Sequence, residues 1–208
     1  MGGGLWVCSA GASARLDEEF ADAIEAGAHG VEGGAALVCP QEVRTAFGRV
    51  VDVPQAAGDA CRFSFDQLCQ TDLGASCYRA LLDRYGTLVL DDVPQLGTHR
   101  HDESRRFIVL IDQVYESGTR LIASAAVPPS KLFDERNVRL ESDTLPRASH
   151  LRLGSLLEST DGGGAPDPAS DAVLVDVGQV AATRELSFAF RRAASRITEL
   201  CSVEAERA

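Results

Sequence analysis

The sequence predicts an α/β fold, because residues 85–133 contain a strand, a helix and a second strand in succession. Leu88–Leu90 is a short apolar run of the kind that forms a buried strand, and Arg120–Ser124 is another. Between them, from Glu103 to Glu116, apolar residues recur at the spacing of one helix face. A β-α-β unit of this kind predicts two parallel strands joined by a right-handed crossover.

Two acids end the first of these strands. Asp91 and Asp92 follow Leu90 directly, and Pro94 then removes a backbone donor. Ligands of open α/β sheets collect at the carboxyl ends of strands, so this pair is a candidate for a nucleotide or Mg²⁺ site. The alternative, which this pattern alone favours, is a structural role as turn formers or helix-dipole partners. The phosphate-binding pattern GxxxxGK(S/T) does not occur, and the only lysine is Lys131.

Composition narrows the class of protein. The chain has 208 residues, enough for one medium α/β domain, with 45% hydrophobic and 25% charged residues. A net charge of −11 argues against a broad nucleic-acid surface. No stretch approaches the length of about 20 apolar residues that a membrane span needs. The six cysteines form no CxxC pair, which predicts buried thiols in a reducing, intracellular compartment.

The remaining segments predict a mixed organisation around the β-α-β unit. Residues 1–46 are expected to be a loosely ordered segment with one helix, and residues 134–183 a low-complexity or disordered insert. Residues 47–133 form the expected core, and residues 184–208 the C-terminal helix, which starts near Thr183. Further predicted elements are strands at Ala35–Cys39, Phe47–Val53 and Ala60–Phe63 in an antiparallel ribbon, helices at Phe65–Cys69 and Gly74–Tyr85, and an edge strand at Ala172–Val177.

Four consecutive blocks resemble those of one known family. They are FGRVVDVPQAAGDACRFSFDQLC, LGASCYRALLDRYGTLVLDDVPQL, RRFIVLIDQVYESGTRLIASAAVPPSKLF and FAFRRAASRITEL. In this order, over residues 47–133 and 186–200, they resemble the AFG-like ATPase family, which includes the bacterial ZapE proteins. Two positions depart from the family's pattern: Cys77 stands where an acid usually precedes the tyrosine, and Leu200-Cys201 replaces a Glu-Met ending.

The resemblance implies a P-loop-NTPase-like parallel-sheet core of the AAA type, with a small antiparallel ribbon and a C-terminal helix. It implies ATP and Mg²⁺ as cofactors, work on protein clients, and a homo-oligomer in the full-length family. Members are mitochondrial in eukaryotes, associated with protein quality control, and cytoplasmic in bacteria, associated with cell division. Since the family's P-loop precedes the first matching block, the chain is expected to be a C-terminal portion that does not hydrolyse ATP alone. Asp91 and Asp92 belong to a later block than the family's metal-binding acids, whose arrangement they imitate.

The residues that could contact nucleotide or a neighbouring subunit are few, and no catalytic residue or metal ligand is predicted. The candidates are Asp91, Asp92, Arg105, Arg106, Ser124 and Arg196. For the arginines the structural alternative is pairing with Asp112, Glu116 and Glu199. A zinc site at His99, His101 and Asp102 lacks a further ligand, so a polar loop is the favoured interpretation.

A second function class stays open at this point. The chain could be a non-catalytic interaction module that binds a partner protein. It would do so through the helix bearing Arg192 and Arg196 or through the exposed ribbon.

Overall fold

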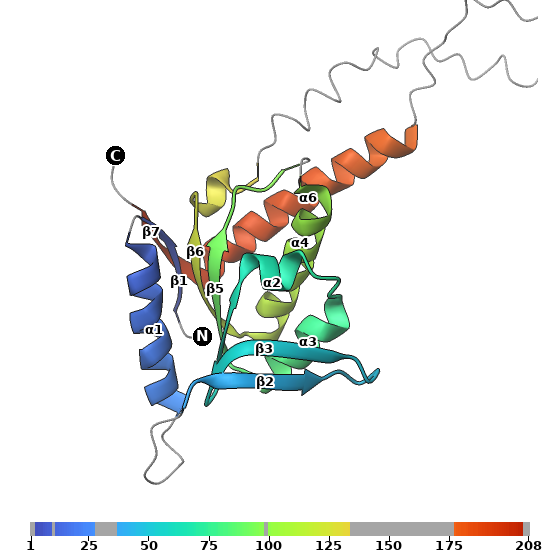
Figure 1. Cartoon of the computed structure of the whole chain (residues 1–208). Helices are drawn as coiled ribbons and strands as arrows, with labels where there is room; N and C mark the ends of the chain where they lie inside the picture. Colours follow the sequence, from blue (N-terminus) through green and yellow to red (C-terminus); the bar gives the residue numbers. More distant parts are fainter. Residues whose placement is uncertain (1–2, 10, 28–36, 98–99, 134–176, 206–208) are drawn as a thin grey trace, which may run out of the picture.

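The computed structural model describes residues 3–9, 11–27, 37–97, 100–133 and 177–205, the helical residues 177–184 by their backbone only. In this part of the chain one seven-stranded sheet has the order β2-β3-β4-β5-β6-β1-β7 (Figure 1). The strands are β1 (Gly4–Cys8), β2 (Cys39–Arg44), β3 (Val50–Ala57), β4 (Ala60–Ser64), β5 (Thr87–Val93), β6 (Arg120–Ala125) and β7 (Cys201–Ala205). Neighbours from β4 through β7 are parallel, whereas β2, β3 and β4 pair antiparallel.

The predicted β-α-β unit is confirmed and lies at the centre of this sheet. β5 and β6 are parallel neighbours, with Leu88 opposite Leu121, and α4 (His101–Ser117) connects them. Phe107, Ile111 and Val114 of α4 are fully buried because they share the face that packs on the sheet. The mostly parallel α/β sheet is consistent with a P-loop-like core.

Helices cover both faces of the sheet (Figure 1). α1 (Ala12–Gly27) packs alone on one face, where its residues Leu16 and Phe20 bury against Val89 and Ile122 of the strands. The other face carries α2 (Phe65–Cys69), α3 (Ala75–Arg84), α4 and α6 (Val177–Leu200), with a 3-10 turn, η2 (Pro129–Lys131), against α6. This second face holds the larger apolar core.

The start of the chain differs from the prediction. Residues 4–8, expected to lie loosely on the body, form the inner strand β1 between β6 and β7. Trp6 is fully buried, and its indole N–H donates to the carbonyl oxygen of Val127 at 3.1 Å. The prediction was wrong because the apolar run Leu5–Val7, which forms the buried strand, is short and follows a glycine-rich start.

The antiparallel ribbon is confirmed, but two of its strands are displaced along the sequence. β2 is Cys39–Arg44 instead of Ala35–Cys39, and β3 begins at Val50 instead of Phe47. Phe47 lies in a tight turn in which the Thr45 N–H donates to the Arg49 carbonyl oxygen at 2.8 Å. Gly48, with φ of 79°, supplies the left-handed residue of that turn.

The end of the chain also differs from the prediction. α6 begins at Val177, within the stretch expected to be an insert, and the unpredicted strand β7 follows it. The rest of that stretch, residues 134–176, lies outside the described residues, as does the predicted edge strand at 172–177 apart from Val177. The helices predicted at Phe65–Cys69 and Gly74–Tyr85 are confirmed as α2 and α3, with Gly74 and Tyr85 as the caps of α3.

Candidate functional site

The topology points to one edge of the sheet, the one formed by the carboxyl ends of the parallel strands, as a site for ligands. The chain leaves β1 toward α1 on one face and leaves β6 toward η2 and α6 on the other. β1 and β6 are adjacent, so their carboxyl ends form the topological switch point where ligands of open α/β sheets bind. Asp91, Asp92 and Ser124 lie at this edge, on β5 and β6.

Asp91 is held by an arginine that the sequence did not single out. Arg62 of β4 donates from Nε and Nη2 to the two carboxylate oxygens of Asp91, at 2.6 and 3.0 Å. Its Nη1 reaches Asp17 of α1 at 2.5 Å, and its guanidinium lies over the Phe20 ring at 5.9 Å. The hydrogen bonds with Asp91 and then Asp17 raise the pKa of Arg62 above its ordinary value. Asp91 is therefore neutralised in a bidentate pair.

Asp92 adopts a conformation that depends on its neighbour. Its φ is 58°, in the left-handed region, where β5 bulges between Leu90 and Val93. The Asp92 N–H donates to Ser124 Oγ at 2.8 Å, and Ser124 is buried. Two of the predicted residues thus meet across β5 and β6, and the Asp92 side chain is exposed.

The three arginines predicted as contacts lie away from this edge. Arg105 is exposed on α4, and Arg106 donates to the carbonyl oxygen of Cys69 at 3.1 Å. Arg196 pairs with Asp112 of α4, and its guanidinium lies over the ring of Tyr115 at 4.8 Å. The structure therefore brings none of them to Asp91, and their part in nucleotide or subunit contact stays a prediction.

The residue that sequence reasoning missed is Arg62, and one signal for it exists. Arg62 stands in an apolar strand, Ala60–Ser64, where an unpaired cation would be costly. Its partner is 29 residues away, and only the parallel register that sets Ser64 opposite Asp91 brings the two side chains together. An arginine in an apolar strand, next to a strand that ends in an aspartate, is the pattern that could have predicted this pair.

Among the described residues no group of three or more His, Cys, Asp and Glu could hold a metal ion, and His99 lies outside them. All six cysteines are free thiols, four of them buried. Burial raises the pKa of Cys8, the half-buried thiol at the end of β1.

Comparison with known proteins supplies the family. The model of the family described as AFG1-like ATPase matches residues 17–158. The chain belongs to the AFG1-like ATPase family. Of the positions at which the sequence departs from the pattern expected from the resemblance, Cys77 is buried in α3, and Cys201 opens β7 with its Sγ 3.6 Å from the Leu121 carbonyl oxygen.

Individual relatives are similar to this AFG1-like chain over parts of their length. The lactation elevated protein 1 homolog B of Danio rerio is 30% identical over 153 residues, 74% of this chain and 27% of that protein. An uncharacterized protein of Schizosaccharomyces pombe is 32% identical over 56% of this chain and 26% of its own length. The cell division protein ZapE of Escherichia coli is 35% identical over 38% of this chain and 21% of its own length.

The chain thus spans about a quarter of the length of the relatives it matches. No solved structure matches it. None of the described helices is long and apolar enough to cross a membrane.

Proposed function

We propose that these residues form a non-catalytic portion of an AFG1-like ATPase that couples ATP binding and hydrolysis to work on protein clients. The observation that carries the proposal is the bidentate pair between Arg62 and Asp91 at the switch-point edge. An acid that serves Mg²⁺ must offer its oxygens to the metal, and here both oxygens of Asp91 accept from Arg62.

The chemistry of phosphate binding supports the same proposal. ATP needs a loop of backbone amides and a lysine around its β- and γ-phosphates. The pattern that builds such a loop does not occur in the 208 residues, and Lys131 is the last residue of η2. We therefore infer that this chain alone neither holds ATP and Mg²⁺ nor turns ATP over, and that these cofactors act in the whole enzyme.

The clients and the place of action are inferred from relatives. One relative carries the name of a cell division protein, so we infer a role of this kind, or in mitochondrial protein quality control, for the whole enzyme. The whole enzyme is expected to assemble as a homo-oligomer.

Calorimetric titration of the purified 208-residue chain with ATP and Mg²⁺ tests the proposal. We expect no binding heat in the titration and, in a separate phosphate assay, no phosphate release above background. The variant Arg62→Ala frees Asp91 and serves as the matched control, which we expect to remain silent because the phosphate loop is still missing. Binding at micromolar ATP by the unaltered chain would contradict the proposal.

A second candidate function is an interaction module. Arg192 and Arg196 of α6, which would carry the helix version, both pair with Asp112 of α4. Their charges serve an intramolecular contact, and this favours the ribbon as the binding surface. A partner that loses affinity when the ribbon is altered, but not for Arg192→Ala, would support this version.

A further inference from the structure

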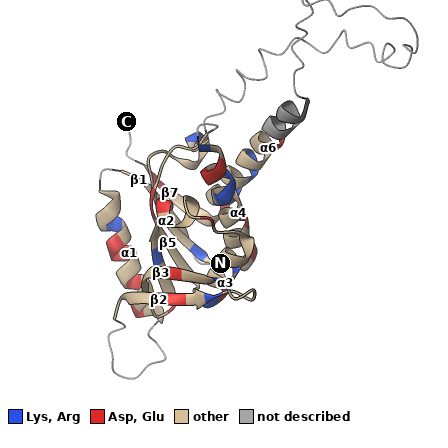
Figure 2. Cartoon of the chain, turned by 45° about the vertical axis from the view of Figure 1, so that its right-hand side comes forward, with Lys and Arg blue, Asp and Glu red and all other residues tan. Residues whose placement is uncertain are grey.

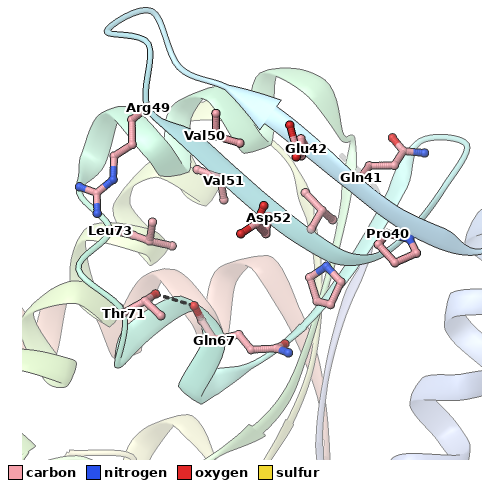
Figure 3. A pocket seen from close by; sticks show the side chains of 12 residues that line it. Pro40, Gln41, Glu42, Arg49, Val50, Val51, Asp52, Gln67, Thr71 and Leu73 are labelled. Carbon is pink, nitrogen blue, oxygen red and sulfur yellow. Dashed lines mark hydrogen bonds between the residues drawn. The ribbon is translucent and has the colours of Figure 1, made fainter.

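A groove lies beside the first half of β3. It has a volume of about 650 Å³ and runs between the β2–β3 hairpin and the segment that includes α2 and the residues after it. In Figure 3 the hairpin lies across the top of the groove, with Leu73, Thr71 and Gln67 on the side facing it. The groove therefore has the hairpin as one wall and the segment with α2 as the other, and it opens to solvent between them.

The wall formed by β3 is an unpaired strand edge. β4 pairs with β3 only through Gln55, Ala56 and Ala57, whereas residues 50–53 pair with β2 alone, and Pro54 between them has no backbone N–H. The chain of β4 then turns into α2, whose capping box uses the Ser64 N–H to donate to Gln67 Oε1 at 2.8 Å. Residues 50–53 thus present a free edge of backbone groups to the groove.

Two carboxylates on the hairpin form no ion pair with any residue that the structure describes. Glu42 of β2 lies directly opposite Asp52 of β3, both side chains are exposed, and both residues line the groove. Figure 2 shows acidic positions side by side on these two strands. Like charges directly opposite each other repel. The groove's arginine, Arg49, donates instead to the carbonyl oxygen of Asp72.

We propose that this groove binds an extended, basic segment of a partner protein. The segment adds as a strand to the free edge of residues 50–53 and sets a lysine or arginine against Asp52 and Glu42. Strand addition explains the unpaired edge, and the cation relieves the repulsion between the two acids. The apolar side chains of Val51 and Leu73 supply the pocket for an alternate apolar residue of the same segment.

This inference deepens the interaction-module candidate and is independent of the nucleotide proposal. Peptide binding is measured without ATP, and nucleotide binding without peptide. Either result can therefore fail while the other stands.

The test is fluorescence anisotropy of the whole chain with a labelled peptide of about ten residues that alternates valine and lysine. We expect saturable binding that weakens as salt rises. The variant Asp52→Lys should weaken it about tenfold or more, because a repulsion replaces the attraction. The matched control Asp22→Lys makes the same charge change on the exposed side of α1 and should leave binding within about twofold.

Two further peptides distinguish strand addition from a general attraction of a basic peptide to this acidic protein, whose net charge is −11. A peptide with N-methylated backbone should lose binding, because it cannot join the strand edge. A peptide with glutamate in place of lysine should also lose it. Equal binding of the charge-reversed or N-methylated peptide, no binding of the lysine peptide, or equal losses in Asp52→Lys and Asp22→Lys would overturn the proposal. Circular dichroism confirms that each variant is folded.

Discussion

Two strand aspartates of this sheet have opposite surroundings. Asp91 of β5 is 19% exposed and held by Nε and Nη2 of Arg62, whereas Asp52 of β3 is exposed and faces another acid, Glu42. The first belongs to the parallel part of the sheet. The second belongs to the antiparallel hairpin at the other end of the strand order. The difference teaches that a strand carboxylate with an arginine partner serves the fold, whereas one that faces another acid stays available to a partner.

The largest effect should come from breaking the Asp91 pair. In Arg62→Ala, Asp91 loses a partner that is itself only 14% exposed, so we expect the free energy of unfolding to fall by about 2–3 kcal/mol. Urea denaturation followed by circular dichroism measures it.

Arg44→Ala, on the exposed part of β2, is the matched control for this loss and should change stability by less than about 0.5 kcal/mol. Equal losses in the two variants would mean that the pair does no more for the core than a surface charge.

The next effect comes from a thiol in the parallel part. Burial raises the pKa of Cys201 to about 12 from its ordinary 9.0. Above pH 9 the thiol ionises in the unfolded chain but stays protonated in the folded one. The stability it contributes is therefore complete below pH 9 and is lost as pH rises toward 12.

The variant Cys201→Ala isolates this contribution. We expect the stability of the unaltered chain to fall by roughly 2 kcal/mol more than that of the variant between pH 9 and about pH 10.5. Denaturation under a reducing agent, at matched ionic strength, gives both curves. Parallel curves would show that Cys201 ionises alike in the folded and unfolded chain.

The elements of this sheet differ in how far the sequence alone predicts them. The helix α4 and its strands were predictable because the apolar spacing of residues such as Phe107 and Val114 is local. β1 was missed because its five residues show neither helix spacing nor the alternation of a half-buried strand. In the hairpin, the turn at Thr45–Arg49 sets the residue at which β3 begins. The geometry of a turn can move the start of a strand along the sequence, and composition does not reveal this.

The site was predictable only in part. Asp91, Asp92 and Ser124 were predicted because strand ends in α/β sheets hold ligands. The structure brings them to one edge, and their contact with nucleotide or a neighbouring subunit stays a prediction. Arg62 and the pair of Glu42 and Asp52 were missed for one reason. Each depends on strand register, which joins residues 29 positions apart for Arg62 and Asp91 and which local patterns do not encode.

A smaller effect, with the opposite sign, should appear on the hairpin. In Glu42→Gln the repulsion across the strand pair disappears, so we expect stability to rise by about 0.5 kcal/mol at low salt. The gain should shrink as salt screens the two charges in the unaltered chain. Urea denaturation at low and high salt measures both. A loss of stability, or a gain in stability that does not change with salt concentration, would mean that Asp52 does not repel Glu42.

The last test changes no stability and compares the thiols of the two regions. Cys39 of β2 is exposed, whereas Cys61, Cys69, Cys77 and Cys201 are buried. At about pH 8 a disulfide reagent should label Cys39 fast, Cys8 slowly because burial raises its pKa, and the four others only after denaturation. The variant Cys39→Ser removes the fast phase and identifies it.

The labelling also reports on the groove, because Cys39 precedes Pro40, which lines it. A basic peptide seated beside the hairpin should slow the labelling of Cys39 and leave the rate of Cys8, at the far side of the sheet order, unchanged. Protection of both thiols alike would point to a general effect of the peptide on the protein. Protection of Cys39 alone, lost again in Asp52→Lys, would place the peptide on the hairpin by a measurement independent of affinity.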